Sequence, residues 1–433
     1  MRLASTAYLQ TIAAQAKGDL VWLGLKPSVQ WVYRAQERMI SVLNDSHADM
    51  VYADRFQVIN GEVIEAPTIE YQAGSLRDDF DFGEVLLFRR EAFIKAVEAL
   101  PAYEYAGLYA LRLAMQKIVH LPEFCYYTTM EQSTESQFDY VNPANRAVQI
   151  EMEQAVTAYL KRIGAFINYQ TLKSCCRSGR PGDCAAESGE LTASVIIPCR
   201  NRVQTIADAV HSALQQEVRT PYSFNVIVVD DNSTDGTKEV LAGIKDERLI
   251  VIHQDKTYHA IGGNWNMAIH DPRCGKYAIQ LDSDDTYSGT DTVQRFIDKF
   301  EEGHYGMVIG SYQLTDIDGN PLPPGKIDHA EWTDENGMNN ALRINGLGAP
   351  RGFDTTLLRN IDFPTTKYGE DYAVGLRISR EYKIGRIWDV VYNCRRWSNN
   401  SDANCTIEQL NRNNRYKDWI RTVELQARLL KND

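Results

Sequence analysis

Short apolar runs rich in β-branched residues alternate with amphipathic segments in the second half of the chain. Each run ends in polar residues: SVIIP from Ser194, VIVVDD from Val226, LIVIH from Leu249 and YAIQLD from Tyr277. A strand, a helix and a second strand in succession indicate parallel pairing. The helix carries the chain back across the sheet, so the second strand runs in the same direction as the first. We therefore predict an α/β domain with a doubly wound, mostly parallel sheet.

The N-terminal half carries a weaker copy of the later part of this pattern. GDLVWLGLKPS from Gly18 is similar to GKYAIQLDSDDT from Gly275. Three further pairs of segments follow in the same order, starting at Ala48 and Tyr305, at Gly83 and Gly348, and at Tyr103 and Gly369. The strands SVIIP and VIVVDD have no counterpart, so the repeat predicts a partial domain.

These patterns divide the chain into four predicted segments. We expect a degenerate partial domain at 1–140, a helix and linker at 141–190, a complete α/β domain at 191–405 and a C-terminal helix at 406–433. Helical spacing begins near Asn145, and SGRPGDCAAESGE has the composition of a linker. In the last helix we expect the apolar positions to pack inward: Tyr416, Trp419, Ile420, Val423, Ala427 and Leu430.

Composition excludes several classes of protein. The 433 residues are 44% hydrophobic and 24% charged, and no run approaches the roughly 18 apolar residues of a membrane span. The first residues lack the apolar core of a signal peptide, so we expect a cytoplasmic protein with reduced thiols. Cys175, Cys176 and Cys184 do not match the paired spacing of structural zinc. A net charge of -12 argues against nucleic acid as a partner.

Polar residues gather where the predicted strands end. They are Arg200 and Asn201, Asp230 and Asp231, then Asp282, Asp284 and Asp285. In open α/β sheets, ligands bind beyond the carboxyl ends of the strands, so these side chains are expected to line one crevice.

Two of these clusters have a functional and a structural interpretation. The carboxylates of LDSDD suit Mg²⁺ or Mn²⁺ held against a diphosphate, although an acidic turn after a strand is equally common. VVDDNSTDGT can bind a base or a ribose, while Asn232 or Ser233 caps the next helix.

GEDY at 369–372 also allows two interpretations. A carboxylate there can act as a general base, and acidic residues also favour the N-terminus of a helix. These two roles are compatible.

The ordered set of motifs is more specific than any member. SVIIPCRNR, VIVVDDNSTDGT, LDSDD, RGF, GEDY and CRRW occur in the order seen in the family 2 glycosyltransferases with the GT-A fold, and the resemblance covers about half of the chain. The N-terminal copy resembles the distal half of that fold in degenerate form.

The resemblance implies inverting, metal-dependent transfer of a sugar from a nucleotide diphosphate sugar, with UDP expected, to a carbohydrate or lipid-linked acceptor. It also implies the site residues. Asp231 binds the base, with Asp230 beside it and Pro198, Arg200 and Asn201 on the loop wall; Asp282 contacts the ribose; Asp284 and Asp285 hold Mn²⁺ or Mg²⁺. Asp371 is the catalytic base with Glu370 as neighbour, Arg395 or Arg396 faces the diphosphate, and Arg351 and Trp397 contact sugar or acceptor.

The chain departs from the family in two places. CRRW lacks the glutamine of the usual last motif, which argues against processive synthesis. The N-terminal copy lacks the carboxylates. Alignment of the two copies pairs residues 282–285 with Leu25, Lys26, Pro27 and Ser28, and pairs residue 371 with Tyr105. We therefore expect one working site. A nucleotidyltransferase and a non-catalytic glycan- or nucleotide-sugar-binding protein are the competing hypotheses.

Overall fold

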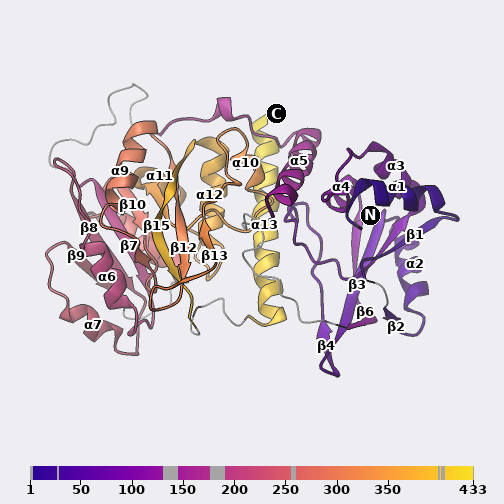
Figure 1. Cartoon of the computed structure of the whole chain (residues 1–433), viewed down its shortest axis with the longest axis horizontal. Coiled ribbons are helices and arrows are strands. Elements are labelled where there is room, and N and C mark those ends of the chain that lie inside the picture. Colours follow the sequence, from indigo (N-terminus) through magenta and orange to yellow (C-terminus); the bar gives the residue numbers. More distant parts are fainter. Residues whose placement is uncertain are drawn as a thin grey trace. The chain divides into compact units, whose positions relative to one another are not determined.

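The chain forms two compact units (Figure 1). The computed structural model describes residues 3–26, 29–129, 145–175, 191–254, 260–397, 400 and 405–432. Unit 1 comprises Met1–Phe166, Leu342–Asn345 and Asn404–Asp433, and unit 2 comprises Ile167–Ala341 and Gly346–Ala403. The predicted four-segment division rests on sequence likeness and stays a prediction. The SGRPGDC linker, Cys176 and Cys184 lie outside the described residues.

Unit 2 is built on a nine-stranded sheet of order β11-β15-β12-β14-β10-β7-β8-β9, with β13 paired to β12. Its bounds are β7 Ala193–Cys199, β8 Phe224–Asp230, β9 Leu249–His253, β10 Tyr277–Gln280, β11 Thr286–Tyr287, β12 Met307–Thr315, β13 Pro321–Ile327, β14 Arg351–Asp354 and β15 Ile384–Arg395. Strands β10, β7, β8 and β9 pair in parallel, as predicted. Every residue of β7 and β8 is buried, as expected of strands covered on both faces.

Helices cover both faces of this sheet. They are α6 Ile206–Leu214, α7 Thr237–Gly243, α8 Ala260–His270, α9 Thr292–Gly303, α10 Gly337–Asn340, α11 Thr355–Ile361 and α12 Glu370–Glu381, with a short 3₁₀ turn at Tyr169–Thr171. Neighbouring residues of β14 point to opposite faces: Gly352 lies against Phe296 of α9, and Phe353 packs on Trp265 of α8. The doubly wound α/β prediction is confirmed.

Unit 1 contains a six-stranded sheet of order β1-β5-β3-β6-β2, with β4 paired to β3. The strands are β1 Leu20–Gly24, β2 Gln30–Trp31, β3 Met50–Ile59, β4 Glu62–Ala66, β5 Val85–Arg89 and β6 Ile118–Thr129. The helices are α1 Thr6–Gln15, α2 Ala35–Asp45, α3 Arg90–Ala99, α4 Gly107–Ala114, α5 Arg146–Ile163 and α13 Ile407–Asn432. The helices predicted near Asn145 and at the C-terminal end are therefore present. Among the described residues, no helix is long and apolar enough to cross a membrane.

The two sheets share a strand order. β1, β5, β3, β6 and β2 match β10, β14, β12, β15 and β11 in sequence order and in the direction of each pairing. Leu20 pairs with Arg89 as Tyr277 pairs with Asp354. Common descent of the units stays a prediction, but this register places Leu25 at the position of Asp282.

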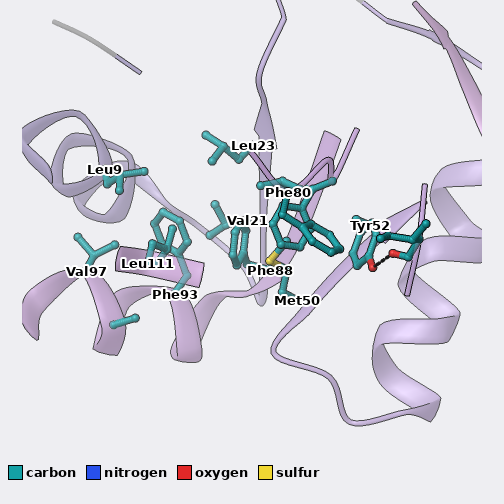
Figure 2. Packing of buried hydrophobic residues seen from close by; sticks show 14 residues of the cluster. Leu9, Val21, Leu23, Met50, Tyr52, Phe80, Phe88, Phe93, Val97 and Leu111 are labelled. Carbon is teal, nitrogen blue, oxygen red and sulfur yellow. Dashed lines mark hydrogen bonds between the residues drawn. The ribbon is translucent and has the colours of Figure 1, made fainter. Parts of the chain in front are cut away.

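Apolar side chains occupy the matching positions in unit 1. Leu23 and Leu86, which correspond in register to Gln280 and Arg351, belong to the buried cluster drawn in Figure 2. Figure 2 also shows Leu9 of α1 and Phe93 and Val97 of α3 in this cluster. A hydrophobic core thus fills the place that polar groups occupy in unit 2. Pro27 and Ser28 lie outside the described residues.

The expectation that the apolar positions of the last helix pack inward is wrong for three of them. Trp419, Val423 and Leu430 are exposed, whereas Ile420 is buried. Helical periodicity identifies an apolar stripe but does not say which stripe faces the protein. In α13 the inner face carries paired charges beside Ile420 and Leu425.

Gly74 tests the packing of α13 within unit 1. A Cβ at this position would overlap the α13 backbone at Asp418, Arg421 and Thr422. We predict that Gly74→Ala lowers the free energy of unfolding by about 1–3 kcal/mol, because overpacking forces backbone shifts. Gly243→Ala is the matched control, since nothing lies within 4 Å of its Cβ. Differential scanning calorimetry of both variants measures the effect, and an unchanged Gly74→Ala protein would contradict this packing.

Candidate active site

The predicted polar residues lie at the carboxyl ends of β7, β8 and β10 or in the loops that follow them. The loops after β7 and β8 are joined by two hydrogen bonds: the Asn201 amide donates to Ser233 Oγ (2.8 Å), and the Thr234 amide donates to Asn201 Oδ1 (2.9 Å). Asn201 and Asn232 adopt positive φ angles of 53° and 54°, a conformation that Asn tolerates well. The two loops therefore form one wall.

Asp230 and Asp231 are both buried in this wall. Asp230 accepts hydrogen bonds from the Ser233 amide (3.2 Å) and lies 3.1 Å from His253 Nδ1. Arg200 Nη1 lies 3.7 Å from Asp231 Oδ2. Sequence reasoning missed His253, although its place at the end of β9 was the signal that could have identified it.

The LDSDD loop holds its three carboxylates in different surroundings. Asp282 Oδ1 accepts from Gln280 Nε2 (2.9 Å), and Asp285 Oδ1 accepts from the Arg395 amide (2.7 Å). Burial, followed by the charges of Asp284 and Asp282, raises the pKa of Asp285. Burial also raises the pKa of Asp282. This loop therefore concentrates negative charge that a cation would stabilise.

Asp284 is half-buried, as is Asp282, whereas Asp285 is buried. Asp284 Oδ2 accepts from Trp397 Nε1 (3.4 Å) and Asn400 Nδ2 (3.3 Å), and Arg202 Nε lies 3.6 Å away. Among the described residues, no group of three His, Cys, Asp or Glu side chains is arranged to hold a metal. The oxygen donors at Asp284 and Asp285 nevertheless fit the preference of Mg²⁺ and Mn²⁺.

A cavity of about 130 Å³ connects this loop to the start of α12. It is lined by Ile261, Trp265, Gln280, Asp282, Ala349, Arg351, Phe353, Phe363, Glu370 and Asp371. The structure thus brings together four predicted site residues from distant parts of the sequence: Asp282, Arg351, Glu370 and Asp371. Trp265 lies in the wall, where its ring stacks on Phe363 at 5.0 Å between centroids.

Arg351 connects the walls of the cavity through an ion pair and hydrogen bonds. Its Nη2 lies 2.5 Å from Asp371 Oδ2, and its Nη1 donates to Gln280 Oε1 at 2.9 Å. Nε donates to the Leu347 carbonyl (2.5 Å), and Nη2 also donates to the Gly348 carbonyl (2.8 Å). The guanidinium is buried and therefore fixes the orientation of the Asp371 carboxylate.

Glu370 and Asp371 begin helix α12 but differ in environment. Burial, followed by the negative charge of Asp371, raises the pKa of Glu370 to about 8. Glu370 therefore keeps its proton near neutral pH. The Asp371 side chain is more exposed and pairs with Arg351, so it is the better proton acceptor of the two.

The two arginines of CRRW have different surroundings. Arg395 is buried, with Nε donating to the Asp284 carbonyl (2.5 Å) and Nη1 donating to Asp208 Oδ2 (2.9 Å). Arg396 is half-buried, and its amide donates to the Thr315 carbonyl (2.7 Å). Arg395 therefore braces the LDSDD loop, a role that the sequence could not distinguish from contact with a diphosphate.

Part of this chain is similar in sequence to known proteins. The family model Glycosyl transferase family 2 matches residues 194–360. The chain is 30% identical over 189 residues to the Escherichia coli enzyme UDP-Glc:alpha-D-GlcNAc-diphosphoundecaprenol beta-1,3-glucosyltransferase WfaP, covering 43% of this chain and 69% of that protein. The chain belongs to glycosyltransferase family 2. Unit 2 of this glycosyltransferase family member has the GT-A fold that the sequence resemblance implied.

Other relatives differ in extent. The putative teichuronic acid biosynthesis glycosyltransferase TuaG of Bacillus subtilis is 34% identical over 131 residues, which are 30% of this chain and 50% of that protein. This family 2 chain spans half or less of the length of the first curated relatives it matches. Among solved structures, S. aureus TarS 1–349 in complex with UDP-GlcNAc is 19% identical, with a TM-score of 0.42 over 56% of this chain and 73% of that one.

The raised pKa of Glu370 predicts a pH dependence of stability. Between its ordinary pKa of 4.5 and about 8, the folded state keeps a proton that the unfolded state loses. The free energy of unfolding should therefore fall as pH rises through this window. We predict that Glu370→Gln flattens this fall. Urea denaturation from pH 4.5 to 8 measures it, and parallel profiles for the two proteins would contradict the assignment.

Proposed function

We propose that this chain is an inverting, metal-dependent glycosyltransferase that moves a sugar from a UDP-sugar to an acceptor hydroxyl. The observation that supports it most is the cavity shared by Asp282 and Asp371, with Arg351 between them. A donor held at Asp282 would present its anomeric carbon to a proton acceptor on the opposite wall. This distribution of groups suits displacement from the face opposite the leaving group.

The wall formed after β7 and β8 would hold the nucleotide. Asp231 would accept from the edge of the base, with Asp230 behind it and Asp282 at the ribose. Pro198, Arg200 and Asn201 would line the wall. UDP as the nucleotide is supported by relatives whose names specify UDP-Glc as donor. The buried carboxylates of this wall suit a neutral base better than a phosphate, which would be repelled.

Asp284 and Asp285 would hold the divalent metal, with Asn400 beside them. Mn²⁺ or Mg²⁺ bound there would neutralise charge on the diphosphate as it departs. Arg395 would keep the loop in place, and Arg396 would face the diphosphate from the rim. Trp397 would contact the sugar or acceptor close to Asp284.

Asp371 would take the proton from the acceptor hydroxyl. The new bond between the acceptor oxygen and the anomeric carbon forms while the bond from that carbon to the diphosphate oxygen breaks. The proton ends on Asp371, and the electron pair leaves with the diphosphate. Arg351 would hold Asp371 in line, and Glu370 would stay protonated. One displacement inverts the anomeric centre.

The acceptor is proposed to be a lipid-linked sugar. Two relatives carry names in which the acceptor is a sugar on diphosphoundecaprenol. A carbohydrate acceptor of this kind presents a neutral hydroxyl to the cavity while its lipid remains in a membrane. Unit 1 would take no part in the chemistry, because Leu86 stands at the strand position that Arg351 has in unit 2, and the proposed sequence repeat pairs Tyr105 with Asp371.

The two copies provide a matched test of the base. Asp371→Asn should lower the rate of sugar transfer by about a hundredfold to ten-thousandfold, because a positioned base is lost, while donor affinity changes little. Glu104→Gln, in the matching segment of unit 1, should leave both unchanged. Radiolabelled sugar transfer and calorimetric donor binding measure the two quantities. A fully active Asp371→Asn enzyme would refute the assignment.

Metal dependence is tested at Asp284. Asp284→Ala should abolish the gain in donor affinity that Mn²⁺ provides, because an oxygen ligand is lost. Asp389→Ala is the control, since this carboxylate is exposed on β15 and pairs with Arg295. Isothermal titration with UDP-sugar is carried out with and without Mn²⁺. Equal donor affinity in chelator-treated and Mn²⁺-loaded wild-type protein would exclude the proposed metal role.

A further inference from the structure

Helix α13 buries several charged side chains beside Ile420 and Leu425, and it exposes the large apolar side chains of Trp419, Val423 and Leu430. Asp418, Arg421, Glu424 and Arg428 are buried on its inner face. Arg421 pairs with Asp418 at 2.9 Å, and Arg428 pairs with Glu424 at 2.8 Å. Large apolar side chains on the outward face of a helix whose inner face carries charge make this surface a candidate contact site.

Contacts within unit 1 fix which face points inward. Asp418 Oδ2 accepts from Ser75 Oγ at 2.9 Å, and Arg421 Nη2 donates to the Ile344 carbonyl at 2.9 Å. Rotating α13 to bury its apolar side would leave these charges without their partners, which is costly in a buried site. The apolar face is therefore held outward.

The outward apolar side chains lie along one side of α13. Tyr416, Trp419, Val423 and Leu430 follow each other at helical spacing over about 21 Å, and we call them the outer stripe. Trp419 is 53% exposed, Val423 43% and Leu430 79%. The Tyr416 and Trp419 rings stack with centroids 5.9 Å apart. Exposed large apolar side chains grouped on one side of a helix mark a candidate interaction site.

Basic residues flank the outer stripe although the whole chain has a net charge of -12. Arg412 and Arg415 precede it and Lys431 follows it, all exposed. Within Ile407–Asn432 the exposed acidic side chain is Glu408, which lies 3.8 Å from Arg412. A second copy of α13 would offer these cations no further carboxylate, so the charges favour an anionic lipid over self-association.

We propose that the outer stripe docks on an anionic lipid bilayer and holds the enzyme at the surface where a lipid-linked acceptor lies. Trp419, Val423 and Leu430 enter the boundary between headgroups and acyl chains, where Trp and Tyr are enriched. Arg412 and Arg415 contact the headgroup phosphates. This inference rests on the lipid-linked acceptor of the proposed function.

Vesicle sedimentation with the full chain tests the proposal. Vesicles of phosphatidylglycerol and phosphatidylcholine should bind the protein, and vesicles of phosphatidylcholine alone should bind it far more weakly. Trp419→Glu with Leu430→Glu should weaken binding by about tenfold or more, because apolar insertion is lost. Arg412→Gln and Arg415→Gln should each weaken it by about fivefold. High salt should lower the wild-type affinity.

Tyr33→Ser is the matched control, because Tyr33 is an aromatic residue of unit 1 that is 91% exposed outside α13. It should bind vesicles as the wild type does. Sugar transfer to a water-soluble acceptor should be equal in the wild type and in Trp419→Glu. If the wild type transfers no sugar to this acceptor, the proposed function is wrong, independently of the vesicle result. Equal binding to both vesicle types would overturn the docking proposal. The docking proposal would also be overturned if sedimentation equilibrium showed that the wild type is a dimer and that Trp419→Glu is a monomer.

Discussion

The buried guanidinium of Arg351 is the interaction on which the candidate site depends. A buried charge is stable only when it is paired and its donors are satisfied. Arg351 meets this requirement with Asp371, with Gln280 at the end of β10, and with the carbonyls of Leu347 and Gly348. These partners come from three places in the sequence, so one side chain holds the sheet, the loop before β14 and the start of α12 in a common geometry.

The same constraint explains the contrast between the two units. Each sheet presents an equivalent strand position next to the equivalent loop, and Gly83 and Gly348 both adopt positive φ there. With Arg at that position, the surrounding groups must be polar, and a cavity with titratable walls results. With Leu86 at that position, the surroundings are apolar and close into a core. An arginine in one unit and a leucine in the other therefore distinguish a polar cavity from an apolar core, although the two sheets have the same topology.

Secondary structure could be predicted from the sequence, whereas contacts between residues far apart in the chain could not. The strands from Ala193 to Gln280 were predictable because buried runs bounded by polar turns carry a strong signal. The partners of Arg351 were not, since two of them are backbone carbonyls that have no sequence signature. Arg395 and Arg396 are neighbours with identical chemistry, and burial alone distinguishes their surroundings. In α13 the periodicity was recognised, but the choice of inner face depends on hydrogen bonds between its buried charges and other parts of unit 1, such as the one that Asp418 accepts from Ser75.

The stereochemistry of transfer tests the central claim most directly, because a single displacement with Asp371 as base fixes it. A UDP-sugar with an α-linked donor sugar is turned over with a soluble acceptor, and the anomeric configuration of the first-formed product is read from its proton coupling by NMR. We predict a β-linked product from the first turnovers onward. An α-linked product would require two displacements or a front-face mechanism and would contradict the role given to the Arg351–Asp371 pair.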